Sequence, residues 1–396
     1  MVFFIFVTIL VDDISRTKEK NKEKFMEFLY EAIAAVTWKH AVMWIIGGIL
    51  IYLAIKKDME PALLLPIGFG AILVNIPLSN VIGADGNSTG IIEWLFNVGI
   101  EASEALPILL FIGIGAMIDF EPLIVNPKLM ILGAFAQLGI FLTIIVATLL
   151  GFPLKDAASI GIIGAADGPT SILVAIKLSS NYVGPIMVVA YSYMALVPII
   201  QPAVIKAITT KKERRIRMEY KGKKVSKTVK ILFPIVVTLV SGLIAPKSLA
   251  LIGFLMFGNL LNECGVLGNL ADTAKNTLCN LITLLLGITI AFQMQADKFL
   301  STETLMIMGL GLFAFVFDTV GGVLCAKIMN IFCKEKINPM IGAAGISAFP
   351  MSARVIHKMG LKEDPTNYLL MHAVGANVSG QIASAVVGGL IIGLVL

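Results

Sequence analysis

The stretch Gly161-Ile-Ile-Gly-Ala-Ala-Asp167-Gly-Pro-Thr170-Ser171 places one carboxylate inside an apolar run from Ala157 to Ile176. An acid at the bilayer centre costs about 2.5–3.5 kcal/mol and usually faces a cavity or an ion pathway. Because Pro169 removes a backbone donor and disfavours helix before it, we expect the helix to break beside Asp167. Unwound backbone next to a carboxylate predicts an oxygen-rich cation site. The structural alternative is a proline kink with a protonated Asp167 bonded to a neighbouring helix.

The composition excludes a soluble globular protein. Of the 396 residues, 57% are hydrophobic and 14% are charged, whereas average soluble domains have about 25% charged residues. The four cysteines and three histidines lack ligand spacing, so neither a disulfide framework nor a zinc site is indicated. No phosphate-binding glycine loop occurs, and the basic loop lacks the interleaved aromatic residues that would suggest a nucleic-acid partner. The composition therefore indicates a multi-pass protein of the lipid bilayer.

The apolar pattern predicts an all-α polytopic membrane protein with about 10–12 transmembrane or re-entrant helices. Residues 1–37 are interpreted as an N-terminal interfacial segment, and twelve apolar stretches follow. Several have only 14–16 residues, fewer than the roughly 20 that a spanning helix needs, so we expect some to be broken or re-entrant.

A basic loop, residues 209–230, separates two predicted membrane repeats, 38–208 and 231–396. Lys211–Lys230 contains ten basic and two acidic residues, and the positive-inside rule therefore places it in the cytoplasm of a cell-membrane protein. Docking of an acidic partner or anionic lipid is the alternative use of this charge.

Three motifs recur in the same order in both halves. The stretch 63–75 resembles 249–262, 109–117 resembles 285–293, and Gly164-Ala-Ala-Asp167 corresponds to Gly342-Ala-Ala-Gly345. Such duplication is typical of transporters whose broken helices meet near the midplane. We expect two inverted repeats with the ion site between their broken helices.

The second half contains a polar run, His372-Ala-Val-Gly-Ala-Asn377-Val-Ser-Gly380-Gln-Ile-Ala-Ser384. Asn377, Gly380 and Ser384 share one helical face, where oxygen atoms could coordinate a hard cation such as Na⁺. A small-residue helix-packing seam is an equal alternative.

Further candidates lie elsewhere in the apolar segments. Tyr191 and Tyr193 occupy the middle of a span, which suggests hydrogen bonds to a buried group. Arg354 either pairs with an anion or snorkels from a helix end. Asp318 is a second acid inside a long apolar span and a reserve candidate for the ion pathway.

Several motifs together resemble the beta subunit of the sodium-pumping, biotin-dependent decarboxylases of oxaloacetate, methylmalonyl-CoA, glutaconyl-CoA or malonate. The resemblance runs from about His40 to the C-terminus. It rests on Gly-Ala-Ala-Asp-Gly-Pro-Thr (164–170), Ala-Tyr-Ser-Tyr-Met-Ala-Leu-Val-Pro-Ile-Ile-Gln-Pro (190–202), Thr-Thr-Lys-Lys-Glu-Arg-Arg (209–215), Tyr-Leu-Ala-Ile-Lys-Lys-Asp-Met-Glu-Pro (52–61) and Asn-Val-Ser-Gly (377–380).

The resemblance implies a translocase that decarboxylates carboxybiotin, exports Na⁺ and takes up a proton. It implies Na⁺ and a biotin carried on a separate subunit, with a carboxyltransferase alpha subunit, a biotin carrier protein and a small gamma or delta membrane subunit as partners in an oligomeric complex. Asp167 would bind Na⁺ and exchange it for a proton, and Tyr191 or Tyr193 would assist proton delivery. Arg354 would be the cationic partner of the carboxybiotin anion. Thr170, Ser171, Asn377, Gly380 and Ser384 would complete the ion sites.

Two other functions stay open from the sequence. One is a Na⁺-coupled secondary symporter or antiporter that works without a biotin partner. The other is a structural membrane subunit whose glycine-rich spans only pack.

Overall fold

The computed structural model describes residues 30–396 apart from 32, 58, 84–88, 103 and 220–224, so most of the predicted interfacial segment 1–37 lies outside the described residues. Every regular element in the described part is a helix. Seven of these helices are long and apolar enough to cross a membrane, or eight if the bent pair Ile91–Glu101 and Ala105–Met117 forms one span. This confirms an all-α polytopic membrane protein.

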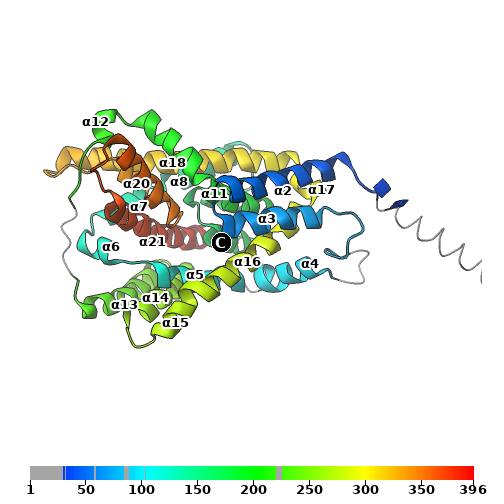
Figure 1. The fold of residues 1–396 in the computed structure, drawn as a ribbon, viewed down its shortest axis with the longest axis horizontal. Helices are drawn as coiled ribbons and strands as arrows, with labels where there is room; N and C mark the ends of the chain where they lie inside the picture. Colours follow the sequence, from blue (N-terminus) through cyan, green and yellow to red (C-terminus); the bar gives the residue numbers. More distant parts are fainter. Residues whose placement is uncertain (1–29, 32, 58, 84–88, 103, 220–224) are drawn as a thin grey trace, which may run out of the picture.

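The helices pack into two groups, which we call the frame and the core (Figure 1). The described helices within 38–117 of the first half and 227–299 of the second half form the frame. Residues 121–208 and 302–395 form the core, so each half contributes to both groups. The frame consists of α2 (Trp38–Lys57), α3 (Pro61–Val74), α4 (Ile91–Phe96), α5 (Ala105–Met117), α13 (Lys227–Ile244), α14 (Leu249–Glu263), α15 (Gly268–Asp272), α16 (Cys279–Ile290) and α17 (Ala296–Phe299).

The core contains two helical hairpins, each with an unwound tip between its helices. Its elements are α6 (Glu121–Val125), α7 (Leu129–Phe135), α8 (Leu138–Leu149), α9 (Leu154–Gly161), the 3₁₀ turn η2 (Ile162–Ala165), α10 (Gly168–Lys177), α11 (Val183–Ile208), α18 (Thr302–Phe332), α19 (Met340–Ala343), α20 (Met351–Glu363) and α21 (Leu370–Val395). The short helix α12 (Lys211–Arg214) lies against α20, as Figure 1 also shows.

Inside the frame, helices of the first half pack against helices of the second half in two matching pairs. Helix α3 packs against α16, and α5 packs against α14. The Asn75 amide at the end of α3 donates to Met294 O at 2.7 Å. The Asn259 amide of α14 donates to Ile118 O, just after α5, at 3.0 Å. In each half, an asparagine therefore donates a hydrogen bond to the backbone just after the helix of the other half against which its own helix packs.

A first hairpin, residues 154–177, enters the core and returns to the same end. It comprises α9, η2 and α10. At its base, the Asp156 carboxylate accepts hydrogen bonds from the Ser180 hydroxyl at 2.7 Å and the Asn181 amide at 3.0 Å. These contacts lie next to the beginning of α11 at Val183.

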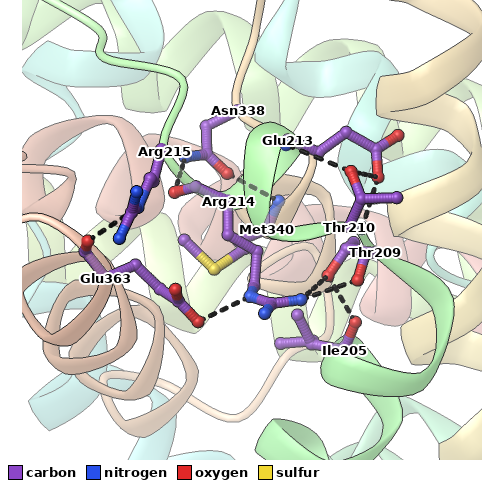
Figure 2. Close-up of polar contacts among 9 residues, drawn as sticks. All are labelled: Ile205, Thr209, Thr210, Glu213, Arg214, Arg215, Asn338, Met340 and Glu363. Carbon is purple, nitrogen blue, oxygen red and sulfur yellow. Dashed lines mark hydrogen bonds and ion pairs between the residues drawn. The ribbon is translucent and has the colours of Figure 1, made fainter.

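A second hairpin, residues 338–363, starts at the other end of α11 and comprises α19 and α20. Figure 2 shows Arg214 at its base, between Glu363 and Thr209. Arg214 Nε lies 2.8 Å from the Glu363 carboxylate, and its Nη1 donates to Thr209 O at 2.6 Å. Asn338 donates from the start of this hairpin to Arg214 O at 2.9 Å. These contacts follow the end of α11 at Ile208.

The tips of the two hairpins meet inside the core. The Ser347 N–H of the second hairpin donates to Ala165 O of the first at 3.0 Å. Because α11 has 26 residues and so spans about 39 Å, bases at its opposite ends let both tips reach the interior between them. The fold therefore brings together two unwound segments that are about 180 residues apart in sequence.

Candidate functional site

Asp167 lies at the tip of the first hairpin, where one helix ends and the next begins. Ala166 has a left-handed φ of 51°, and Asp167 is the extended N-cap residue of α10. Pro169 follows within the first turn, where its missing N–H leaves no helical bond unmade. The expected break beside Asp167 is therefore present. The carboxylate is buried, with 4% of the residue exposed.

Hydroxyl groups from three elements surround one oxygen of this carboxylate. Asp167 Oδ2 accepts from Thr170 Oγ1 at 2.6 Å, Ser384 Oγ at 3.0 Å and Ser347 Oγ at 3.2 Å. Thr170 belongs to α10, Ser384 to α21 and Ser347 to the second hairpin. Since a hydroxyl oxygen keeps acceptor lone pairs while it donates, the same groups can turn toward a cation.

Two amides of α21 hold the tip of the second hairpin. Asn377 donates to Ala344 O at 3.2 Å and Ile346 O at 2.7 Å, and the Gln381 amide donates to Ser347 O. Their amide oxygens, Asn377 Oδ1 and Gln381 Oε1, are buried and have no hydrogen-bond partner among the described residues. Buried acceptors are normally satisfied, so these two oxygens are available to a ligand.

The chemistry of this cluster suits a hard monovalent cation. The described residues contain no group of three or more His, Cys, Asp or Glu side chains that could hold a metal ion. One carboxylate, hydroxyls and amide oxygens remain, and hard cations such as Na⁺ favour oxygen ligands of these types. The small negative charge matches a single positive charge better than a divalent ion.

Gly380 and Ser171 occupy supporting places beside this cluster. A Cβ atom on Gly380 would lie 2.2 Å from Gly345 O, so only glycine lets α21 approach the second hairpin this closely. The Ser171 hydroxyl donates to the backbone oxygen of Asp167 at 2.8 Å. Their positions favour shaping of the site, and direct coordination by either stays a prediction.

The two tyrosines of α11 face different neighbours. The ring of Tyr191 covers Gly168, where a Cβ atom would lie 2.3 Å from the ring, and its buried hydroxyl has no partner among the described residues. The Tyr193 hydroxyl donates instead to Met308 O of α18 at 2.5 Å. Of the two candidates, Tyr191 is the one beside Asp167.

Arg354 lies apart from the oxygen cluster, on a cavity of about 440 Å³ between α11 and α20. Lys358 and Lys362 follow it at four-residue intervals on α20, and Lys206 of α11 also lines the cavity. Two acids also line it: Glu60, the residue before α3 in the frame, and Glu363 at the end of α20, against four basic side chains. The cavity therefore presents mostly positive charge, which favours an anionic ligand.

Ion pairs fix the base of the second hairpin. A hydrogen bond from Arg214 lowers the pKa of Glu363, against the opposing effect of burial. A hydrogen bond from Arg217, with further bonds from Thr366, lowers the pKa of Asp364 to about 2. Both acids are therefore charged at neutral pH, and they tie the basic segment after α11 to the end of α20.

The structure brings together residues that sequence analysis placed in one site and adds two that it missed. Asp167, Thr170 and Ser384 are joined by direct hydrogen bonds. Ser347 and Gln381 were not predicted. Gln381 stands within the polar run of the last helix. Ser347 closely follows the stretch 342–345 that we predicted to be the repeat counterpart of Gly164–Asp167, so this predicted alignment was the signal that could have found it.

The chain matches known proteins over nearly its whole length. Residues 39–395 match the family described as the Na⁺-transporting oxaloacetate decarboxylase beta subunit. The methylmalonyl-CoA decarboxylase beta subunit of Propionigenium modestum is 49% identical, and the match covers 89% of this chain and 94% of that one. The glutaconyl-CoA decarboxylase beta subunit of Acidaminococcus fermentans is 48% identical, over 91% and 94%.

An oxaloacetate decarboxylase beta chain, from Klebsiella pneumoniae, is 44% identical over 90% of this chain and 95% of its own length. All three relatives are named as beta subunits, but of decarboxylases that are named for different substrates. With matches this long, the chain belongs to the family of Na⁺-transporting decarboxylase beta subunits.

Proposed function

We propose that this chain is the membrane subunit that releases CO₂ from carboxybiotin and couples this to outward Na⁺ transport with uptake of a proton. The observation that carries the proposal is the Asp167 carboxylate at the meeting point of two hairpin tips, with hydroxyls from Thr170, Ser347 and Ser384 around it. Asn377 Oδ1 and Gln381 Oε1 supply the remaining neutral oxygens.

Asp167 exchanges Na⁺ for a proton in this proposal. Na⁺ binds to the ionised carboxylate and the neutral oxygens around it, with Ser171 and Gly380 shaping the site. Once the site opens to the outside, Na⁺ leaves and the carboxylate takes a proton. At about 150 mV, moving one Na⁺ outward costs roughly 3.5 kcal/mol before any concentration gradient. Decarboxylation supplies this free energy.

Tyr191 assists proton transfer to or from Asp167. Its ring packs on Gly168, the residue after Asp167, and its hydroxyl makes no other bond among the described residues. Tyr193 supports α11 instead, since its hydroxyl is held by Met308 O on α18.

The basic cavity at Arg354 receives carboxybiotin. Arg354, Lys206, Lys358 and Lys362 line it, and their charges fit the carboxylate of this ligand. Loss of CO₂ from carboxybiotin leaves a nitrogen that takes up one proton, which is the proton delivered through Asp167. The cavity lies on α20, the longer helix of the second hairpin, and this position supports coupling between the two sites.

The complex contains further subunits. Biotin arrives on a carrier protein after a carboxyltransferase alpha subunit has loaded it, and a small gamma or delta subunit joins in the membrane. Segment 211–230 lies on the cytoplasmic side of the cell membrane, as its basic charge favours. The Arg354 cavity lies near the same end of α11, so it faces the carrier.

The two halves are inverted repeats. The reciprocal pairing of α3 with α16 and of α5 with α14 supports this proposal, as do hairpins that begin at opposite ends of α11. In such transporters the ion site lies where the broken helices meet, and the two repeats gate it from opposite sides.

The test is the rate at which the purified chain decarboxylates a carboxybiotinylated carrier protein, with and without Na⁺. Wild type should show Na⁺-dependent release of CO₂, and Asp167→Asn should not. Asp272→Asn, which changes an exposed acid of the frame, is the matched control and should behave as wild type. Na⁺ binding without decarboxylation would overturn the proposal in favour of a Na⁺-coupled symporter or antiporter.

A further inference from the structure

A second acid, Asp318, is buried in the core and does not belong to the cluster around Asp167. It lies in the middle of α18 and is fully buried, with 0% of the residue exposed. Its Oδ1 accepts the backbone N–H of Ile140 at 3.2 Å, and the Gly139 N–H also donates to the carboxylate. These are amides of the first turn of α8, where the helix begins again after the break at residues 136–137.

The other oxygen of Asp318 points toward the first hairpin. Oδ2 has no hydrogen-bond partner among the described residues. A Cβ atom on Gly164 would lie 2.4 Å from it, so the oxygen lies directly against η2. Gly164 precedes Asp167 by only three residues in the chain. Asp318 therefore packs against the segment that carries Asp167.

No charged side chain faces Asp318 from the elements packed around it. Helices α7, α8 and α19 and the turn η2 contain no ionisable residue. From α11, Tyr193 packs two turns away, against Gly311. The acid of α9, Asp156, binds Ser180 and Asn181 at the hairpin base, Lys155 of the same helix is exposed, and Lys327 of α18 pairs with Glu213.

A bare carboxylate in this place is unfavourable, and a metal cation does not relieve it. Burying an unpaired charge is so costly that the group neutralises instead. Amide N–H groups occupy Oδ1 and repel a cation, so only one oxygen would be left for coordination. A proton needs only that oxygen. Around Asp167, by contrast, hydroxyls of Thr170, Ser347 and Ser384 converge on one carboxylate oxygen, so we contrast a proton site at Asp318 with an Na⁺ site at Asp167.

We propose that Asp318 binds a proton and stays neutral, and that it acts as a positioning residue for the hairpin that carries Asp167. The neutral carboxyl group accepts hydrogen bonds from the α8 amides and packs against η2 without adding a second negative charge to the core. Asp167 then remains the single charge that selects a cation where the hairpins meet.

Infrared spectroscopy of the purified chain in saturating Na⁺ at neutral pH tests the protonation. Wild type should show the carbonyl stretch of a protonated carboxyl group, and Asp318→Asn should lack it. Asp167→Asn and the exposed control Asp272→Asn should retain it. A band that persists in Asp318→Asn would overturn the proposal. This readout needs no decarboxylation, so it stands or fails independently of the proposed function on which the positioning role rests.

Kinetics test the positioning role. Asp318→Asn keeps a neutral acceptor for the α8 amides and should turn over within about threefold of wild type, with an unchanged Na⁺ requirement. Asp318→Leu leaves those amides without an acceptor and should raise the Na⁺ concentration for half-maximal rate by about tenfold. A tenfold or greater loss of turnover in Asp318→Asn would mean that the negative charge is used, and would overturn the proposal.

Discussion

The first hairpin and the second hairpin reach the same place from opposite ends of α11, but only the first places a charge there. Asp167 caps α10 in the first, whereas the corresponding tip of the second exposes backbone carbonyls that Asn377 and Gln381 of α21 hold in place. One hairpin supplies charge and the other supplies shape. Selective binding of one cation needs both. A carboxylate alone would bind cations without discrimination, and neutral oxygens alone would bind a cation weakly.

The largest expected effect comes from moving the charge between the hairpins. Asp167→Asn should lower Na⁺ affinity about a hundredfold, because a charged ligand contributes most to the site. Since Ser347 Oγ lies 3.2 Å from Asp167 Oδ2, adding Ser347→Asp should restore about tenfold of this loss. The measurement is the Na⁺-dependent rise in the thermal unfolding temperature of the purified chain.

A double variant no better than Asp167→Asn would mean that the two tips do not share one site. Ser379→Asp in place of Ser347→Asp is the control for added charge. The Ser379 hydroxyl is held by Leu129 O and Ala376 O, away from Asp167.

Removing single hydroxyls should have an intermediate effect. Ser347→Ala and Ser384→Ala should each weaken Na⁺ binding by about three- to tenfold, the value of one hydrogen-bonding group. Ser379→Ala removes a hydroxyl from the same helix as Ser384 but should leave binding unchanged. Radioactive Na⁺ binding to detergent-purified protein would measure all three. Equal losses in the three variants would indicate general loosening of α21.

A smaller effect should follow from filling the contact between α21 and each hairpin. Gly380→Ala brings a methyl group 2.2 Å from the rigid backbone oxygen of Gly345 and should cost about 1–3 kcal/mol of stability. Gly388→Ala meets the Thr170 Cγ2 methyl at 2.8 Å and should cost less, because a side chain can move. A Cβ atom on Gly393 would have no described neighbour from outside its own helix within 4 Å, so Gly393→Ala is the control. Thermal unfolding without Na⁺ ranks the three, and any other order would contradict the contacts.

The smallest effect should come from low pH, which weakens the ion pair of Asp364 beside the two ends of the second hairpin. A carboxylate whose pKa is lowered on folding stabilises the folded state above its unfolded pKa of about 3.9. For Asp364, this contribution is lost as the pH falls toward its folded pKa of about 2. Cleavage of segment 209–218 by pepsin should therefore increase between about pH 4 and pH 2. Asp364→Asn should be cleaved faster at pH 4 and depend less on pH, and unchanged cleavage in this variant would contradict the ion pair's role.

Much of the fold followed from local chemistry along the chain. Apolar composition required a membrane protein, and Pro169 beside Asp167 required a break in the helix. The charge of Lys211–Lys230 predicts a division between two halves, which stays a prediction. These properties depend on near neighbours and on transfer from water to lipid, and both can be read from a single sequence.

The partners of Asp167 were only partly predictable. Thr170 lies three residues away, so its contact is local, and Ser384 was selected because helical spacing places it on the face of Asn377. Ser347 is 180 positions from Asp167 and lies in an unwound tip, where no periodicity indicates its direction. The same difficulty hid the amide oxygen of Gln381, which has no hydrogen-bond donor in the described part of the chain, because whether a buried acceptor has a donor depends on every neighbour.

By itself the sequence determined the membrane class, the broken helix and the acid at its centre, because an apolar run, a proline and a carboxylate act through short-range chemistry. Only the tertiary structure decided that the second hairpin meets that acid, that Tyr191 rather than Tyr193 lies beside it, and that Asp318 faces Gly164. These are contacts between segments far apart in the chain. They depend on how whole helices pack, where a glycine admits close approach or a methyl group prevents it.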